Sequence, residues 1–566
     1  MQIIIPMSGF GERFRRAGYQ IPKPLIEIED KPIIAHVIDL FPSETDFIFI
    51  CNEEHLGEPK YKMREILGRY CSTGTIVAIP PHKLGPVHAV LEVEKYINQN
   101  SPVVVNYCDF TCYWDWKHFK SFVKETKSHG SIPAYRGFHP HSLGTTNYAY
   151  LQEQNGWVKS IQEKQPYTDN RMEEYASSGT YYYATGKLML DAFKATIEQD
   201  LKTGGEFYAS LTYLPLLSKG YNISVYELQH FMQWGTPADV DEYLEWSKTF
   251  KALTKPENVN TPRSGSLIIP MAGLGKRFKD AGYETTKPLI SVSGEPMVYQ
   301  AASCLPPAEE NVFVLREDMP ECEQISTFLE NSYDASIATL KKLSQGQADS
   351  ALFGLLEHEK NNGVQIKAPI TLGACDNGVF YNKQTFDDLI ANTDVDVIVW
   401  GVRRHVNAVR NPHMFGWISA TDGKIDKISV KQPLENPETD PIVIGTFTFK
   451  YRKDLLACIE SMHKREAKVN GEYYLDTCIN DAIALGLNCY LFEVDSYISW
   501  GTPNDLKTFE YWQSCFHKWP GHPYDLRKDR LIEKASIDPL NQRYSKKTPE
   551  LIEPATPAPV VLETES

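Results

Sequence analysis

A glycine-rich segment near the N-terminus combines residue types that could hold phosphate groups. In PMSGFGERF, Gly9 and Gly11 come directly after the apolar run Ile3 to Ile5, which predicts a strand. Ligands of open α/β sheets bind beyond the carboxyl ends of the strands, and glycine lets backbone amides approach a phosphate closely. Arg13 adds a permanent cation, and Lys23 in PKPL adds a second one. Two glycines and two cations predict a cradle for a polyphosphate.

This segment differs from the common phosphate-binding fingerprints. GxxxxGK[ST] is absent, and Phe14 and Phe278 stand where GxGxxG would have its third glycine. A single GxGxR would be typical of an ordinary turn with a surface arginine. Its combination with KPL at a fixed spacing, twice in the chain, favours a nucleotide site.

The chain contains two collinear copies of one sequence unit. IIIPMSGFGERFRRAGYQIPKPLIEI, beginning at Ile3, returns as LIIPMAGLGKRFKDAGYETTKPLISV, beginning at Leu267. EKQP, GGEFY and QWGTPAD return in the same order as VKQP, NGEYY and SWGTPND. The second copy therefore has its own glycines and cations, which are Gly273, Gly275, Arg277 and Lys287.

The repeat predicts two domains, although a length of 566 residues alone would suggest three or four. We expect the domains at 1–250 and 266–519, a solvated linker at 251–265, and a mobile, Pro-rich and charged tail at 520–566. In the first copy, β-rich runs alternate with amphipathic, helix-length segments such as Ile33 to Leu40. The β-rich runs are Gln2 to Ile5, Asp46 to Ile50, Thr75 to Ile79 and Val103 to Asn106. This alternation predicts an α/β fold with a mostly parallel sheet between helices.

The charge balance argues against some classes of partner. Against 73 Asp+Glu there are 58 Lys+Arg, and the resulting net charge of -15 does not favour nucleic acid or anionic membrane. No apolar run approaches the roughly 18 residues of a membrane helix, and the first apolar stretch is short for a signal peptide. We therefore expect a cytoplasmic protein.

The eleven cysteines have no CxxC spacing, so we expect them to be reduced rather than to form a disulfide framework. Cys108 and Cys112 could imitate a metal cluster together with His118. Without a second cysteine pair, ordinary packing is the favoured interpretation, and no structural zinc is predicted.

On these motifs the chain resembles the nucleotidyltransferase family that activates sugar phosphates, whose signature is a strand, GxGxR and then PKPL. The resemblance runs from Met1 to about Trp512 and is closest to the branch found in bacterial capsule and cell-surface polysaccharide pathways. It implies a Rossmann-like α/β domain in each copy. It also implies that a nucleoside triphosphate and a phosphorylated acceptor, foremost a sugar 1-phosphate, react with Mg²⁺ to give an NDP-sugar and pyrophosphate.

The resemblance also implies roles for individual residues in both copies. The triphosphate would be wrapped by Gly9, Gly11, Gly273 and Gly275, and the catalytic cations would be Arg13, Lys23, Arg277 and Lys287. Gly85 and Gly346 lie in the loops that would contact the base. Asp109 and Asp376 would bind magnesium, and the acceptor would be held by Glu163, Lys164, Gly179, Lys431 and Gly445.

The sequence departs from this family pattern at several positions. Val430 stands where the first copy has Glu163, which argues against a sugar acceptor in the second copy. Gln233 and Ser499 replace a second metal-binding aspartate, so metal binding would depend on one aspartate per copy. In GTPAD, Thr236 and its neighbours are also explained as a helix cap.

A basic segment differs between the copies as well. The second copy has Arg403, Arg404 and Arg410 where the first has Arg136, His139 and His141. This difference predicts different acceptors, and a solvated basic loop is the alternative explanation.

Other functions stay open on the sequence. One is a cytidylyltransferase for a non-sugar phosphate such as phosphocholine, and another is a nucleotide-binding regulatory protein in which one or both copies are inactive. A glycosyltransferase would need Asp-x-Asp after a strand, but Asp394-Val-Asp396 precedes the apolar run Val397 to Trp400. The base, the acceptor and a homo-oligomeric state are also left open.

Overall fold

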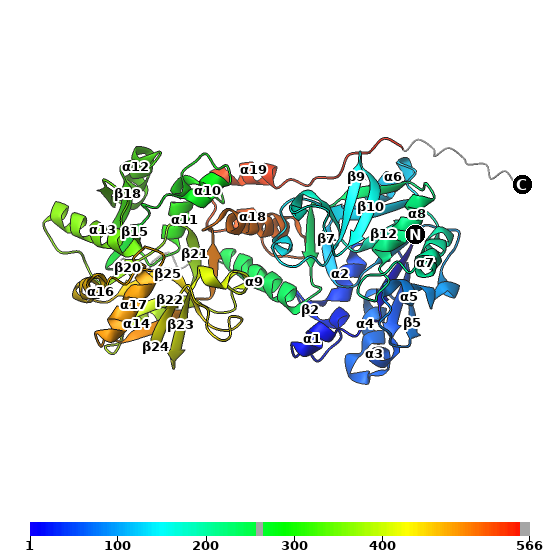
Figure 1. Ribbon diagram of the computed structural model, residues 1–566, viewed down its shortest axis with the longest axis horizontal. Coiled ribbons are helices and arrows are strands. Elements are labelled where there is room, and N and C mark those ends of the chain that lie inside the picture. Colours follow the sequence, from blue (N-terminus) through cyan, green and yellow to red (C-terminus); the bar gives the residue numbers. More distant parts are fainter. Residues whose placement is uncertain (256–263, 555–566) are drawn as a thin grey trace, which may run out of the picture. The chain divides into compact units, whose positions relative to one another are not determined.

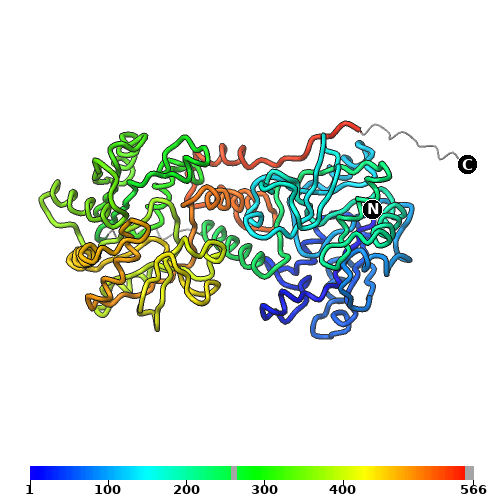
Figure 2. The backbone as a smooth tube through the Cα atoms, viewed as in Figure 1, coloured from blue at the N-terminus to red at the C-terminus, as the bar shows by residue number. Residues whose placement is uncertain are grey.

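The computed structural model describes residues 1–255 and 264–554, and its chain divides into two compact units. Unit 1 comprises Met1–Leu244, Lys518–His522 and 545–554, and unit 2 comprises the described parts of Glu245–His517 together with Pro523–Tyr544. Positions 256–263 of the predicted linker and 555–566 of the predicted tail lie outside the described residues. Figure 1 labels the elements of each unit, and Figure 2 traces the same chain as a tube.

The main sheet of unit 1 is mixed. Its strands are β1 (Gln2–Met7), β4 (Asp46–Asn52), β5 (Thr75–Ile79), β6 (Val103–Asn106), β8 (Gly130–Tyr135), β9 (Ala149–Gln154), β10 (Trp157–Glu163), β11 (Tyr175–Ser177), β12 (Thr180–Tyr183) and β13 (Ile223–Glu227). They follow the order β11-β9-β10-β13-β8-β12-β6-β1-β4-β5. The predicted β-rich runs form β1, β4, β5 and β6, which pair in parallel.

The expectation of a mostly parallel sheet is wrong for the other half, because β9 pairs antiparallel with β10, and β12 pairs antiparallel with both β6 and β8. Only Asn155 and Gly156 connect β9 to β10, and both have a positive φ, of 53° and 80°. Such a two-residue turn joins antiparallel neighbours, and Asn-Gly is its strongest sequence signal. The α/β class is confirmed, and the sheet is mixed.

Helices cover both faces of this sheet. The helices of this unit are α1 (Glu12–Arg16), α2 (Ile33–Asp39), α3 (Glu53–Gly57), α4 (Met63–Tyr70), α5 (Pro86–Leu91), α6 (Trp116–Glu125), α7 (Gly186–Glu198) and α8 (Tyr213–Ser218). Helix α9 (Pro237–Leu253) begins in unit 1, and its residues from Glu245 on belong to unit 2. Successive side chains of a strand point to opposite faces. Tyr183 accordingly packs edge-on against Phe193 of α7, and Tyr182 packs edge-on against Phe119 of α6.

Unit 2 has a main sheet with a corresponding succession of strands. Its strands are β15 (Ser266–Pro270), β18 (Glu310–Arg316), β19 (Ala335–Leu340), β20 (Ile370–Leu372), β22 (Val397–Val402), β23 (Gly416–Thr421), β24 (Lys424–Val430), β25 (Ile442–Phe449) and β26 (Cys489–Glu493). The order is β19-β18-β15-β20-β25-β22-β26-β24-β23. It matches unit 1 read from β5, except that the long β25 pairs with β20, β22 and β23 and so takes the places of both β12 and β11.

Two layers of helices enclose the sheet of unit 2. Its helices are α10 (Lys276–Asp280), α11 (Met297–Ser303), α12 (Cys322–Tyr333), α13 (Gln347–Asn362), α14 (Lys383–Ala391), α15 (Val406–Arg410), α16 (Arg452–Lys464), α17 (Leu475–Ala484), α18 (Pro503–Lys518) and α19 (Lys534–Arg543). In β15, Ile268 packs into the core cluster that contains Leu355 of α13. Its neighbour Ile269 packs into the cluster that contains Leu329 of α12, on the opposite face.

The segments outside the repeated unit are more ordered than predicted. Helix α9 continues to Leu253, so the predicted linker begins inside a helix. Within the predicted mobile tail, 520–554 is described and contains α19, whose Leu540 is buried, as is Tyr544 directly after it. The average composition of this segment is polar, but these apolar side chains are spaced so that they can pack, which is why composition alone misjudged it.

Two further observations concern the whole of the described chain. All eleven cysteines are free thiols. Across 1–255 and 264–554, none of the helices has the length and apolar character required to cross a membrane.

Candidate active site

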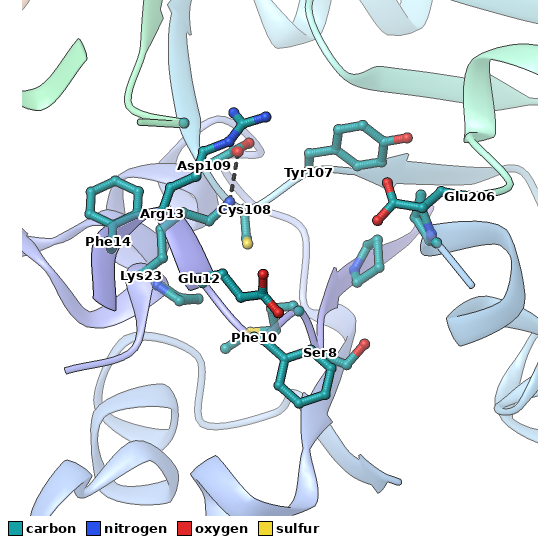
Figure 3. A pocket seen from close by; sticks show the side chains of 18 of the residues that line it. Ser8, Phe10, Glu12, Arg13, Phe14, Lys23, Tyr107, Cys108, Asp109 and Glu206 are labelled. Atoms are coloured by element: carbon teal, nitrogen blue, oxygen red, sulfur yellow. Dashed lines mark hydrogen bonds and ion pairs between the residues drawn. The ribbon is translucent and has the colours of Figure 1, made fainter. Parts of the chain in front are cut away.

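The glycine-rich segment forms the loop between β1 and α1 in unit 1. Gly11 is the N-cap of α1 and has a φ of 63°, a left-handed conformation that favours glycine. Gly9, Gly11, Arg13 and Lys23 all line a cleft of about 510 Å³. Figure 3 shows this cleft with the side chains of Arg13, Lys23 and Asp109. The structure thus brings the predicted phosphate-binding residues together at the carboxyl end of β1.

Asp109, the predicted magnesium ligand, lies in the same cleft and contacts one of the predicted cations. It follows β6, and its Oδ2 accepts a hydrogen bond from Lys23 Nζ at 2.8 Å. Burial is the largest single influence and acts to lower the pKa of Lys23, but the Asp109 carboxylate and Cys108 together raise this pKa above its ordinary value. Lys23 is therefore a permanent cation at this site, and it is paired with the carboxylate.

Gly85, predicted for the base-contacting loop, also lines the cleft. Its φ is 92°, and a Cβ there would lie 2.7 Å from the backbone N and O of Phe207. Phe207 N donates to Leu84 O at 2.9 Å, and Val87 N donates to Phe207 O at 3.2 Å. This close backbone pairing requires glycine, and it fixes the GGEFY segment beside the loop.

The GGEFY segment supplies site residues that were not assigned from the sequence. Glu206 and Tyr208 line the cleft, as does Tyr107, which follows β6. Tyr107 OH accepts a hydrogen bond from Ala209 N at 3.2 Å, so it also holds this segment in place. The recurrence of GGEFY as NGEYY was the signal that could have identified these residues.

A second pocket of about 210 Å³ adjoins the first, and the two share residues that include Arg13, Asp109 and Tyr208. The predicted acceptor-binding residues Glu163, Lys164 and Gly179 line this second pocket. Sequence order separates these residues from the phosphate loop by more than half of the first copy. The antiparallel half of the sheet brings these acceptor-binding candidates close to the glycine-rich loop.

Lys164 is held in an unusual backbone conformation at the end of β10. Its φ is 60°, which is uncommon for a residue with a side chain, and its backbone N donates to Tyr148 O at 2.8 Å. Lys164 Nζ donates a hydrogen bond to Tyr208 OH, and it lies 4.4 Å from the centre of the Tyr208 ring. Residues kept in such conformations are common at functional sites.

Glu163 is a half-buried carboxylate beside Lys164. Its Oε2 accepts a hydrogen bond from Ser210 Oγ at 2.5 Å. Burial raises the pKa of Glu163 to about 7, although the Ser210 hydroxyl and the Lys164 ammonium both act to lower it. The ionised form of this side chain accepts a stronger hydrogen bond from a ligand hydroxyl than the neutral acid does.

Gln233, found where a second metal-binding aspartate was expected, is part of a hydrogen-bond chain. Its Oε1 accepts from Tyr148 OH, and its Nε2 donates to Asp239 Oδ2 at 2.9 Å. Asp239 also accepts from Thr236 N at 2.8 Å, and Thr236 Oγ1 accepts from Asp239 N at 3.2 Å. GTPAD is therefore a helix cap, as expected, and it also positions Gln233 at the acceptor pocket, where Gly235 lines both pockets.

The residues predicted for unit 2 adopt corresponding local structures. Gly275 is the N-cap of α10 with a φ of 60°, and Lys287 Nζ donates to Asp376 Oδ2 at 2.5 Å. At Gly346, where φ is 142°, a Cβ would lie 2.5 Å from the backbone of Tyr473. Lys431 has a φ of 59°, and Gly445 in β25 has a φ of 77°.

The basic segment does not belong to the two pockets described in unit 1. The residues lining them do not include Arg136, His139 or His141. Arg136 lies over the Tyr175 ring at 4.3 Å, and His139 packs on Tyr135, where burial lowers the pKa of His139 to about 4. In these positions they contribute to packing, so the prediction that they distinguish the acceptors is not supported in unit 1.

Within 1–255 and 264–554, no group of three or more His, Cys, Asp or Glu side chains is arranged to hold a metal ion. Mg²⁺ needs less than this from a protein, because it is bound through one or two carboxylates together with substrate phosphates and water. Asp109 in a phosphate-binding cleft fits a magnesium ion that arrives with the nucleotide.

Sequence comparison identifies the class of protein to which this site corresponds. The model of the nucleotidyl transferase family matches residues 2–215, which include the glycine-rich loop, Asp109 and Lys164. Residues 2–215 are therefore similar to the nucleotidyl transferase family, in agreement with the predicted class of enzyme.

Individual relatives are distant and match in part. Mannose-1-phosphate guanyltransferase of Saccharomyces cerevisiae is 28% identical over 148 residues, which are 25% of this chain and 40% of that protein. The enzyme of the same name from Gibberella zeae is 24% identical over 294 residues, 49% of this chain and 74% of that protein. The chain spans about two fifths of the length of the first curated relatives it matches.

Among solved structures, a nucleoside-diphosphate-sugar pyrophosphorylase from Vibrio cholerae is similar with a TM-score of 0.36 and 20% identity. The similarity covers 43% of this chain and 99% of that one.

Proposed function

We propose that unit 1 transfers a nucleotidyl group from a nucleoside triphosphate to a phosphorylated acceptor. The observation that carries this proposal is the pair of adjoining pockets in unit 1. One contains the glycine-rich loop, the other contains Glu163 and Lys164, and both are lined by Arg13 and Asp109. A reaction between two bound phosphates requires such a shared boundary, where the reacting atoms can meet.

In the proposed reaction, an oxygen of the acceptor phosphate forms a bond to the α-phosphorus of the nucleotide. The bond from that phosphorus to the oxygen bridging to the β-phosphate breaks, and pyrophosphate leaves with the electron pair. The attacking phosphate is already anionic at neutral pH, so no general base is required. Arg13 and Lys23 offset the charge on the leaving group, and Lys164 orients the acceptor phosphate.

Asp109 is the residue that would hold Mg²⁺ in unit 1, and Asp376 is its counterpart in unit 2. When bound, the ion supplies positive charge to the phosphate oxygens on which negative charge develops. In the structure, the Lys23 ammonium group donates a hydrogen bond to the Asp109 carboxylate. We infer that Lys23 turns toward the triphosphate when Asp109 is engaged by the metal.

The acceptor that we propose is a sugar 1-phosphate, with an NDP-sugar for surface polysaccharide synthesis as the product. Glu163 and Lys164 support this choice, since a carboxylate next to a lysine suits a ligand with a hydroxyl and a phosphate. The names of the relatives, mannose-1-phosphate guanyltransferases, are consistent with such an acceptor.

We further infer that unit 2 is a second nucleotidyltransferase domain that arose by tandem duplication. Its strand succession, its Lys287–Asp376 pair and its positive φ at Lys431 support this inference. The repeated motifs of the sequence support it independently.

A pyrophosphate-release screen tests these proposals. Four nucleoside triphosphates are combined with several sugar 1-phosphates and with phosphocholine, using the wild type and the variants Arg13→Ala and Arg277→Ala. We expect release with at least one sugar 1-phosphate, and we expect each variant to lose the activity of its own unit. Release with phosphocholine alone would favour the cytidylyltransferase alternative. Nucleotide binding without release in any combination would favour a regulatory protein.

A further inference from the structure

The two units differ in where a carboxylate lies beside the acceptor lysine. In unit 1, Glu163 at the end of β10 faces Ala149 of β9 in the strand register, and Ser210 donates a hydrogen bond to Glu163. In unit 2, the register places Val430 opposite Gly416. The residue of unit 2 that corresponds to Ser210, by alignment of GGEFYAS with NGEYYLD, is Asp476. One carboxylate is therefore lost from the strand, and another is present in the first turn of α17.

The structure shows that these exchanges are linked sterically. A Cβ added to Gly416 would collide with Oδ2 of Asp476, so the carboxylate occupies the space that the alanine methyl group fills in unit 1. Gly416 also pairs with Val430, which is adjacent to the acceptor lysine, Lys431. The Asp476 carboxylate thus lies against the same strand pair that carries Glu163 in unit 1, but it arrives from a helix.

Asp476 and Lys431 are close enough to affect each other's charge. Burial raises the pKa of Asp476 to about 6, and the Lys431 ammonium acts to lower it. Burial lowers the pKa of Lys431, and the Asp476 carboxylate opposes this. In the described part of the chain, no side chain donates a hydrogen bond to Asp476, whereas Ser210 donates to Glu163. Its carboxylate therefore keeps lone pairs for a ligand.

A simpler explanation is that Asp476 is one of the acidic residues that favour the first turn of a helix because of the helix dipole. That explanation would account for an acid at position 476. It does not account for the glycine at 416, which makes room for the carboxylate, or for the loss of the acid at 430 next to Lys431. The three exchanges together relocate one negative charge within the same small region.

We infer that Asp476 binds an acceptor hydroxyl in unit 2 and replaces Glu163 in this task, an inference that rests on the proposed function. Its ligand is a phosphorylated compound that has at least one hydroxyl group, with the phosphate at Lys431 and the hydroxyl at Asp476. Because the carboxylate comes from α17 and not from the strand, the hydroxyl is approached from another direction. Unit 2 therefore takes a different acceptor from unit 1, and the valine at 430 does not exclude a sugar phosphate.

The first test measures unit 2 alone, in Arg13→Ala protein that lacks the activity of unit 1. Asp476→Asn is expected to raise the acceptor KM at least tenfold and to leave the KM of the nucleoside triphosphate unchanged. Asp454→Asn is the matched control, because Asp454 is also a first-turn aspartate, in α16 of the same unit. The control is expected to keep the acceptor KM within twofold.

A second set of variants tests the steric link. Gly416→Ala alone is expected to raise the acceptor KM at least fivefold, since the methyl group displaces the carboxylate without removing its charge. The triple variant Gly416→Ala, Val430→Glu, Asp476→Ser rebuilds the arrangement of unit 1. It is expected to recover acceptor binding and to shift preference toward the acceptor of unit 1, measured in Arg13→Ala protein.

Calorimetric titration of acceptors separates the failure of this inference from the failure of the proposed function. If neither unit releases pyrophosphate, the proposed function is wrong, and acceptor binding that Asp476→Asn weakens tenfold would still support the inference. If unit 1 is active but Asp476→Asn changes neither KM nor affinity in unit 2, the inference is wrong. It is also wrong if unit 2 neither turns over nor binds any acceptor of the panel.

Discussion

Lys23 Nζ donates a hydrogen bond to Asp109 Oδ2 at 2.8 Å, so the cation assigned to the triphosphate and the carboxylate assigned to the metal neutralise each other. Such a pair keeps both side chains in the cleft and limits the cost of desolvating either charge. In the proposed reaction, substrate binding separates them, because the triphosphate and the metal then give each a new partner of opposite charge. Lys287 and Asp376 form the same pair in unit 2.

We expect pyrophosphate release by unit 1 to require a divalent cation, which Asp109 would bind. Removal of metal with EDTA should abolish pyrophosphate release, and added Mg²⁺ should restore it. Asp109→Asn should lower turnover at least a hundredfold or require at least tenfold more Mg²⁺, measured by titrating the metal in Arg277→Ala protein. Asp191→Asn, which changes an exposed partner of Lys187, is the control. An unchanged Mg²⁺ requirement in Asp109→Asn would contradict the assignment of the metal ligand.

Arg13 is expected to contribute to catalysis and little to folding. Arg13→Ala should lower the turnover of unit 1 by about 100-fold, which corresponds to roughly 2.7 kcal/mol, because a charge that stabilises the transition state is lost. Its melting temperature should match that of Arg69→Ala, a change at an exposed position of α4. Pyrophosphate release in Arg277→Ala protein and thermal unfolding measure the two effects, and unchanged turnover on adding Arg13→Ala in that background would refute the role of Arg13.

The pKa of Glu163, raised by burial to about 7, predicts a pH dependence of acceptor binding in unit 1. The carboxylate accepts a stronger hydrogen bond from a hydroxyl than the neutral acid does, so the acceptor KM should rise severalfold as the pH falls below about 7. The groups facing Glu163 are Ser210, Lys164 and Glu206. Glu163→Gln should show only the titration of the acceptor phosphate itself. Identical KM profiles between pH 5.5 and 8.5 for wild type and variant would rule out this role.

The Glu163 carboxyl should also make the folding stability depend on pH, in the opposite direction to its effect on acceptor binding. The pKa of Glu163 is higher in the folded protein than in an unfolded chain, so its contribution is most favourable at low pH and is lost as pH rises through about 7. Glu163→Gln should therefore gain melting temperature relative to wild type between pH 5 and pH 8, by about 2 °C or more. Glu198→Gln, at an exposed position of α7, should show no such trend. A difference that stays constant with pH would contradict the prediction.

Local sequence patterns were sufficient for the phosphate loop. Gly9, Gly11 and Arg13 lie within a few residues of each other after an apolar strand, so their spacing alone places them at one end of that strand. The parallel strands were also predictable from their apolar runs. The antiparallel half was missed because the Asn155–Gly156 turn was not interpreted as a hairpin.

The acceptor pocket depended on contacts that sequence separation conceals. Tyr208 reaches Lys164, and Ser210 reaches Glu163, only because a helix-like turn packs against the end of β10. Arg136 and His139 looked as relevant in the sequence, yet they pack elsewhere in unit 1. Residue type could not separate these two groups, since the decisive quantity was distance in the folded sheet.

The sequence by itself determined the repeat, the α/β class and the position of the glycine-rich loop at the end of the first strand, because these depend on periodicity and on neighbouring residues. Only the tertiary structure decided what surrounds the acceptor lysines. Val430 looked like the loss of a carboxylate, but the fold places Asp476 of α17 against Gly416, beside the strand that carries Lys431. A residue distant in sequence can supply a negative charge at the same place in a site, because folding brings its side chain there.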